Sequence, residues 1–259
     1  MSDEHAGIAT LHQAHDAFAS LVSGLDRDEI RARSYCAEWS AAQVASHIGS
    51  GAEFATGWLH AAIDHTDPTE GVDMPAVWDR WNALSPEEQV TEAVAASAGH
   101  VAAFESATTE QLEQAHVVLF GAIELDGFGL ARFRLPELVI HTWDIAVMRD
   151  PSARLLGPAV DFILDGMAAS VGWFGRPQPR AWILNIETRG PERSYVLRNG
   201  EGVTLEAGSS ADADGVMRLP AESLIRLVYG RVDDTTADEI GIDAAGVRLD
   251  DLRAVFPGV

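Results

Sequence analysis

The stretch LPELVIHTWDIAVMRD, Leu135–Asp150, places polar residues at helical spacing inside an otherwise apolar segment. Glu137 and His141 are four residues apart and Asp144 follows three residues later, so all three lie along one edge of an α-helix. We place Pro136 at the start of this helix, because proline is tolerated in the first turn. The segment is therefore expected to bury its apolar side chains and to hold polar groups along one edge.

Three further segments of the N-terminal half show the periodicity of amphipathic helices. Apolar side chains recur at helical spacing over residues 8–22. Ser40 followed by Gln43 is a capping-box pattern and predicts a helix that starts at Ser40. Ser85 with Pro86 directly after it is another start signal. Together with the first stretch these segments predict a four-helix bundle.

The C-terminal half has a different pattern. The break RDPSAR, residues 149–154, separates residues 1–152 from a second domain at 153–259. In that domain one helix is expected over 155–174, followed by short β-like runs that turn residues separate. A further strand is expected to run into a helix through Pro220, and the end of the chain is expected to be helical. These signals predict a smaller α+β domain.

The composition limits the classes of partner. The chain has 259 residues and a formal net charge of −22, which repels nucleic acids and anionic membranes. No apolar run is long enough to span a bilayer and no signal peptide is visible, so we expect a soluble cytoplasmic protein.

The basic residues and the cysteine exclude several chemistries. All 18 basic residues are arginine, which excludes lysine Schiff bases and the phosphate-loop lysine and fits a GC-rich genome. Cys36 is the sole cysteine, so the chain holds no internal disulfide and no cysteine-rich zinc site. We interpret Cys36 as a packed residue rather than a nucleophile, because no activating base is evident near it in the sequence.

One combination of side chains is suited to a metal. His47 lies on the apolar stripe of the second helix beside small residues, and Glu137 and His141 lie on the fourth helix. Two imidazoles and a carboxylate are a ligand set that catalytic zinc uses, with one position left open. The alternative is a surface glutamate beside core histidines. Asp144 is then an orienting partner of His141, another ligand, a solvated neighbour or the partner of an arginine, and His15 is a core histidine or a fourth ligand.

Two motifs resemble those of a known family. CAEWSAAQVASHI (residues 36–48) and PELVIHTWDIA (residues 136–146) resemble motifs of the mycothiol-dependent maleylpyruvate isomerase-like proteins, and LPAESLIRLVYGR (residues 219–231) resembles their sterol-carrier-like second domain. The resemblance implies a DinB-like four-helix bundle followed by an α+β domain. It also implies that His47, Glu137 and His141 hold zinc or another divalent ion.

The same resemblance implies an enzyme that uses the low-molecular-weight thiol mycothiol. A thiol bound to zinc is deprotonated and becomes a nucleophile. It can add to a double bond of a small electrophile and allow cis–trans rotation, stay attached in an S-transfer, or exchange with another thiol. The alternative is a non-catalytic DinB-like protein that binds a metabolite or a thiol conjugate.

The second domain is expected to supply an arginine to this chemistry. Where the electrophile carries a carboxylate, Arg231 is the expected catalytic residue that binds it, and Arg226 is the second candidate. The alternative is that both arginines are surface residues of a helix in a very acidic protein.

Overall fold

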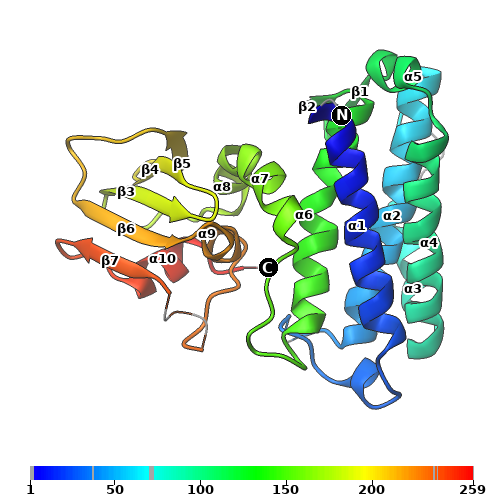
Figure 1. The fold of residues 1–259 in the computed structure, drawn as a ribbon, viewed down its shortest axis with the longest axis horizontal. Coiled ribbons are helices and arrows are strands. Elements are labelled where there is room, and N and C mark those ends of the chain that lie inside the picture. The colour runs from blue at the N-terminus through cyan, green and yellow to red at the C-terminus, as the bar shows by residue number, and fades with distance from the viewer. Residues whose placement is uncertain (1–2, 37, 70–72, 236, 238, 259) are drawn as a thin grey trace. The chain divides into compact units, whose positions relative to one another are not determined.

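The computed structural model describes residues 3–36, 38–69, 73–235, 237 and 239–258, and Figure 1 shows its elements. The chain forms two compact units, residues 1–159 and 160–259. The expected boundary at 152/153 falls just before this division, and residues 153–159 group with the first unit. No helix of the described residues is long and apolar enough to cross a membrane.

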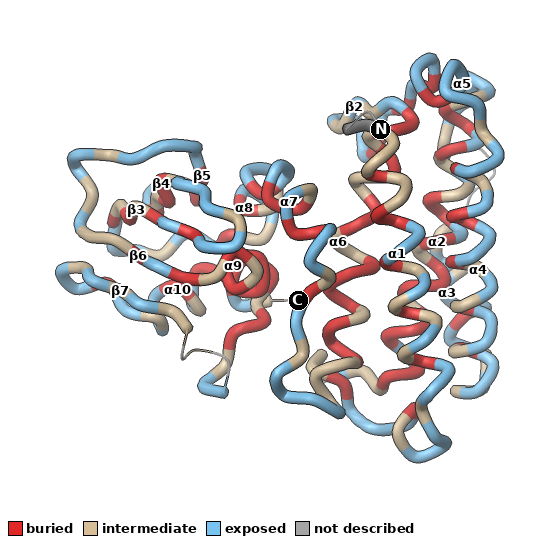
Figure 2. Tube along the Cα trace, viewed as in Figure 1, coloured by how far each residue is buried: buried red, intermediate tan, exposed pale blue. Residues whose placement is uncertain are grey.

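Four long helices make up most of the first unit, as the sequence predicted, and lie side by side in Figure 1. Helix α2 packs mainly against α4, and α1 packs mainly against α6. Buried positions recur along each of them in Figure 2, so their apolar stripes form the core. The long helices are α1 (Asp3–Ser23), α2 (Ala41–Asp64), α4 (Pro86–Ser106) and α6 (Gly127–Ala146). The shorter elements are η1 (Glu29–Arg31), α3 (Met74–Asn82), α5 (Thr109–Gln114), β1 (Val117–Leu119) and β2 (Ile123–Leu125).

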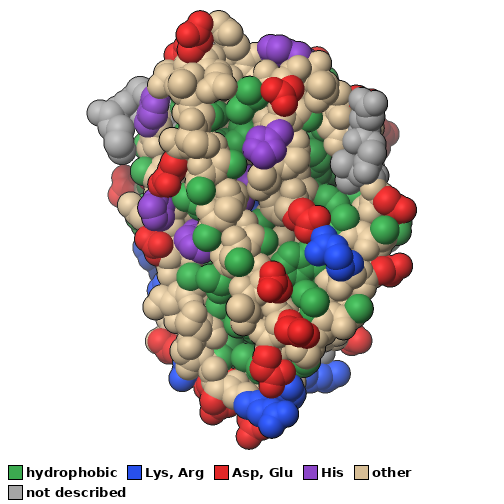
Figure 3. Space-filling view, turned by 90° about the vertical axis from the view of Figure 1, so that its right-hand side faces the viewer, with side chains coloured by type: hydrophobic (Ala, Val, Ile, Leu, Met, Phe, Trp, Pro, Cys, Tyr) green, Lys and Arg blue, Asp and Glu red, His purple; other side chains and the backbone are tan. Residues whose placement is uncertain are grey.

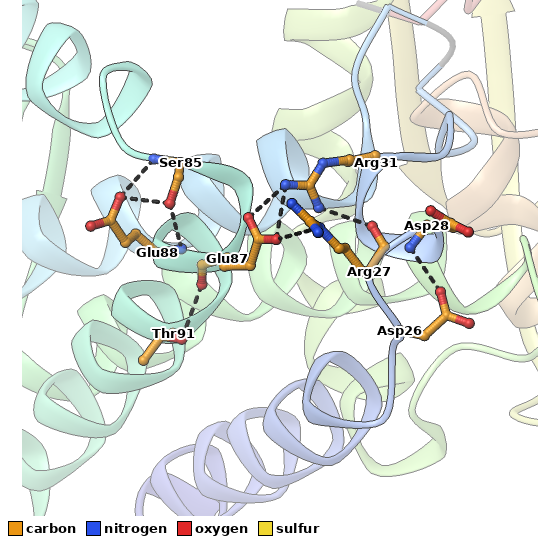
Figure 4. Close-up of polar contacts among 8 residues, drawn as sticks. All are labelled: Asp26, Arg27, Asp28, Arg31, Ser85, Glu87, Glu88 and Thr91. Atoms are coloured by element: carbon orange, nitrogen blue, oxygen red, sulfur yellow. Dashed lines mark hydrogen bonds and ion pairs between the residues drawn. The ribbon is translucent and has the colours of Figure 1, made fainter.

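The predicted start signals of α2 and α4 are confirmed. The Ser40 hydroxyl accepts from the Gln43 backbone at 3.2 Å, and the Gln43 side chain accepts from the Ser40 backbone at 2.9 Å. Ser85 and Glu88 form the same reciprocal pair at the start of α4, which Figure 4 shows. Each pair satisfies backbone N–H groups that a helix start leaves without partners.

The expected start of α6 at Pro136 is wrong. The helix begins at Gly127, where the Asp126 side chain caps it by accepting from the Gly129 backbone at 2.6 Å, and Pro136 lies inside the helix. A Cβ on Gly127 would come within 2.8 Å of the Leu112 Cα, so glycine lets α6 begin directly against α5. The segment before Pro136 contains α5, the β1–β2 hairpin and the first turns of α6.

The second unit is an α+β fold, as predicted. Its five-stranded sheet has the order β5-β4-β3-β6-β7, in which β3 runs parallel to β6 and the other pairs are antiparallel. The single helix expected over 155–174 is broken at Gly166 into two helices. Strand β7 was not predicted, while the run through Pro220 and the helical chain end are confirmed. The elements are α7 (Gly157–Asp165), α8 (Met167–Phe174), β3 (Trp182–Arg189), β4 (Arg193–Asn199), β5 (Val203–Ala207), β6 (Gly215–Pro220), α9 (Ala221–Val228), β7 (Gly241–Ala244) and α10 (Leu249–Val255).

His100 of α4 is buried in the bundle, a position that its sequence pattern does not predict. Thr56 donates its hydroxyl proton to the Ala52 carbonyl, so it accepts from His100 Nδ1 at 3.0 Å. His100 Nε2 has no hydrogen-bond partner among the described residues. Burial, together with the charge of Arg134, lowers the pKa of His100 to about 3.

Gly49 allows α3 and α4 to pack closely against α2. A Cβ at Gly49 would meet the Trp81 ring at 2.3 Å and the Ala93 Cα at 2.9 Å. We expect Gly49→Ala to lower the free energy of unfolding by about 1–3 kcal/mol, because the added methyl overpacks the core. Urea unfolding measures this. Gly57→Ala, on the same helix with nothing within 4 Å, is the control and should raise stability by about 0.5–1 kcal/mol. Equal effects of the two substitutions would contradict the packing.

His100 should make the fold acid-sensitive. The folded state holds its imidazole neutral down to a pKa of about 3, while the unfolded chain binds a proton near pH 6.5. Stability is therefore lost as the pH falls below 6.5, by about 2 kcal/mol between about pH 8 and pH 5. Urea unfolding of His100→Gln should lack this contribution, whereas His60→Gln, at an exposed position of α2, should retain it. The same pH dependence in wild type and His100→Gln would show that the assignment is wrong.

Candidate metal centre

Three side chains of the first unit converge between α2 and α6. His47 of α2 places Nε2 3.1 Å from Glu137 Oε2, and His141 of α6 places Nε2 3.6 Å from the same oxygen. One ligand atom from each residue lies within 4.8 Å of the others. The expectation that Glu137 and His141 share an edge facing His47 is thus met in the geometry.

The donor atoms have the spacing and chemistry of a metal site. Bonds of about 2.0–2.1 Å at tetrahedral angles separate two ligand atoms by about 3.3–3.5 Å. The observed separations of 3.1 and 3.6 Å lie close to this range. His141 donates its Nδ1 proton to Asp144, so its Nε2 has a lone pair, and this lone pair faces the Glu137 carboxylate. Two electron-rich atoms at this distance are suited to a cation between them.

Asp144 orients His141. His141 Nδ1 donates to Asp144 Oδ2 at 2.9 Å, and the Asp144 side chain is 0% exposed. This excludes the solvated-neighbour alternative and is the geometry of an orienting partner, in which a carboxylate fixes the tautomer of a ligand imidazole. His15 bonds Ser97 at 3.0 Å and is not part of the cluster.

Cys36 belongs to this network, which the sequence reasoning missed. Its Sγ donates to Asp144 Oδ2 at 3.0 Å, and the neighbouring Tyr35 backbone donates to the Asp144 carbonyl at 3.0 Å. The motif that begins at Cys36 was the available signal, since it contains Cys36, Trp39 and His47 together. A second group, Cys36 with His141 and Asp144, also has ligand spacing, and it shares His141 with the first.

Neighbouring side chains keep the carboxylate of Glu137 ionised. Burial raises the pKa of Glu137, but the hydrogen bond from His47 and the nearby charges of His141, His47 and Arg134 outweigh it and lower that pKa to about 2. Burial lowers the pKa of His47, which favours the neutral imidazole, the form in which one ring nitrogen has a lone pair. The set at neutral pH therefore includes a carboxylate and a neutral imidazole, as metal ligands must be.

Arg134 is buried beneath the cluster. It donates to the Ile48 carbonyl at 2.6 Å, and burial lowers its pKa to about 10, so it stays charged at neutral pH. A Cβ on Gly51 would come within 2.9 Å of Arg134 Nη1. Glycine at this position of α2 therefore leaves room for a buried cation next to Glu137.

The cluster is open on one side. The Glu137 side chain is 40% exposed and that of His141 only 10%. A pocket of about 370 Å³ adjoins His47, and Trp39 of its wall lies 5.2 Å from the His47 ring and 6.2 Å from the His141 ring. The pocket is lined by Trp39, Gln43, Ser46, His47, Ser50, Trp78, Trp81 and Asn82. An aromatic pocket therefore adjoins one of the three candidate ligands, His47.

Arg226 and Arg231 lie in the second unit, and both are buried. The alternative that they are surface residues is therefore wrong. Arg226 Nη2 donates to Ser223 at 3.2 Å and lies 3.7 Å from Glu222 Oε1, while Arg231 Nη1 donates to the Tyr229 carbonyl at 2.5 Å.

Comparison with known proteins identifies the fold and the family of the chain. None of the curated proteins compared with the chain matches it. A solved structure of a mycothiol-dependent maleylpyruvate isomerase is similar over 95% of both chains, with 12% identity and a TM-score of 0.69. A histidine-to-alanine mutant of such an isomerase gives 12% identity, the same coverage and a TM-score of 0.67. At these identities the likeness establishes the fold. The model of the mycothiol maleylpyruvate isomerase N-terminal domain matches residues 11–146, which include the whole cluster, and the chain belongs to this family.

Proposed function

We propose that the protein is a metal-dependent enzyme that activates mycothiol on zinc, or on another divalent ion, for attack on a small electrophile. The observation that carries this proposal is the convergence of His47, Glu137 and His141, with one side of the set open. Maleylpyruvate isomerisation is the reaction named for the similar structure, and S-transfer or thiol exchange would use the same ligands.

The bound ion would supply one function, which is to lower the pKa of a coordinated thiol so that it is a thiolate at neutral pH. The chain's own residues do the rest. Glu137 would contribute the anionic ligand, and Asp144 holds the His141 ring with Nε2 on the side of Glu137. Trp39 lies beside both imidazoles.

The reaction itself needs a double bond conjugated to a carbonyl. The thiolate sulfur forms a bond to the β-carbon while the π electrons move to the carbonyl oxygen. Rotation about the resulting single bond and loss of the thiolate restore the double bond in the other geometry. In an S-transfer the α-carbon instead takes up a proton. Where the electrophile carries a carboxylate, we propose that Arg231 binds it as a bidentate partner.

Removal of a ligand imidazole should remove the metal. We expect wild-type protein purified without chelator to hold about one ion per chain, and His47→Ala and His141→Ala to hold only background metal and to lose thiol-dependent turnover. Elemental analysis and a circular dichroism check of folding measure this. His60→Ala, at an exposed position of the same helix as His47, is the control and should retain its metal. A folded His141→Ala protein that keeps one ion per chain would rule out the assigned ligands, and a metal-loaded protein that binds thiol without turnover would favour the binding-protein alternative.

Asp144→Asn should weaken the metal site without dismantling it. The amide keeps the shape of the carboxylate but removes its charge, so His141 is held less firmly, and metal affinity should fall about 10–100-fold. Competition with a chromogenic chelator measures the affinity. Asp126→Asn is the matched control on the same helix, because asparagine caps a helix start as well as aspartate does. Equal affinities of the Asp144→Asn and Asp126→Asn proteins would show that Asp144 has no orienting role.

A further inference from the structure

A buried arginine lies beneath the candidate ligands. We infer that Arg134 makes the open position of the bound ion prefer anionic ligands and, for the same reason, weakens the hold of the protein on the ion. The inference rests on the proposed function, in which His47, Glu137 and His141 hold the ion and a thiolate binds at the open side. It adds a positioning residue that acts through the ion, and the class of ligand that this residue selects.

Three features of the structure place the guanidinium between the two helices that carry the ligands. Arg134 precedes Glu137 by three positions on α6, so the two lie on one side of that helix. Arg134 Nη2 donates to the carbonyl of Ile48, the residue after His47 on α2, at 2.6 Å. A Cβ on Gly51, one turn after His47, would come within 2.9 Å of Nη1. The cation is therefore located next to one candidate ligand on each helix.

The charge of Arg134 is not neutralised by a direct ion pair. Within the described residues its hydrogen bond goes to a neutral carbonyl, and Arg134 takes part in no ion pair there. The side chain belongs to a residue that is 6% exposed, and an arginine keeps its proton even when it is buried. A buried charge costs free energy that one neutral acceptor does not offset. The stability of the bundle therefore does not explain the charge, whereas an anion in the site would.

The ionisable side chains around Arg134 come from three helices. They are His47 on α2, His100 on α4 and Glu137 on α6. His100 is neutral, since its pKa is about 3, and imidazoles that bind a metal are neutral. A divalent ion on one carboxylate leaves one net positive charge, and Arg134 adds a second. An anion at the open position would therefore compensate charge that the protein itself leaves uncompensated.

The local charge acts against the charge of the whole chain. The chain carries a formal net charge of −22, and acidic side chains are spread over the face that Figure 3 shows. Salt screens such exposed charges over about 8 Å at physiological ionic strength. Arg134 is screened less, because it is buried beside the ligands. Its field should therefore dominate at the ion, where it repels the cation and attracts an anion.

Removal of the charge should tighten the binding of the metal. We expect Arg134→Met to bind zinc about tenfold more tightly than wild type, because the repulsion is lost. Competition with a chromogenic chelator measures the affinity, and circular dichroism checks the fold. Arg149→Met removes the same charge from an exposed ion pair with Glu29 at 3.0 Å, and its affinity should stay within about twofold of wild type. An unchanged or lower affinity in Arg134→Met would overturn the inference, because loss of a merely structural arginine would loosen the ligands.

Two probe ligands separate charge from access at the open position. Azide is an anion, pyridine is neutral, and both bind a metal through nitrogen. Their dissociation constants are measured at one fixed pH from the absorption spectrum of the full-length protein loaded with cobalt. We expect Arg134→Met to bind azide about tenfold more weakly than wild type and to bind pyridine equally well. An equal loss of both ligands, or no loss of azide binding, would contradict the inference.

Neither measurement depends on turnover, so the inference and the proposed function fail separately. A protein that shows both charge effects but no thiol-dependent turnover would refute the proposed function and keep the role of Arg134. Thiol-dependent turnover by the wild type, with zinc and azide affinities that Arg134→Met leaves unchanged, would refute the inference alone. Arg134→Gln retains an amide donor for the Ile48 carbonyl and has the same expected results, so it replaces Arg134→Met if that variant does not fold.

Discussion

The carboxylate of Glu137 is the contact on which the site depends. Its Oε2 lies 3.1 Å from an imidazole of α2 and 3.6 Å from an imidazole of its own helix. His141 lies near this carboxylate because the two residues are one turn apart on α6. His47 lies near it because α2 packs against α6, so the packing of these two helices forms both the bundle core and the site. Arg134 beneath it keeps a positive charge near the carboxylate, and Gly51 makes the space for that arginine.

Local signals predicted much of this from the sequence. Capping boxes located the starts of α2 and α4, and the polar edge of residues 135–150 located two of the three candidate ligands. These signals can be recognised in the sequence because capping and helical periodicity involve residues only a few positions apart. The α+β character of the second unit followed from its short β-like runs and turn residues, for the same reason.

The features that the sequence did not reveal depend on contacts between distant residues. The start of α6 depends on Leu112 packing against Gly127, so a proline that usually opens a helix lies inside one. Cys36 donates a hydrogen bond to Asp144, which is 108 positions away in the chain and therefore not recognisable as its partner from local sequence. The burial of His100 is set by α2 and α4 packing together, because the polarity of a histidine does not report its depth. Strand β7 is four residues long and pairs only at an edge of its sheet.

The most direct test of the central claim is X-ray absorption at the zinc edge of the full-length protein, with and without mycothiol. The assignment of His47, Glu137 and His141 predicts only nitrogen and oxygen neighbours at about 2.0–2.1 Å in the thiol-free protein, and a sulfur at about 2.3 Å once mycothiol is added. A sulfur neighbour before any thiol is added would place Cys36 in the coordination sphere instead. A spectrum that mycothiol leaves unchanged would contradict activation of the thiol on the metal.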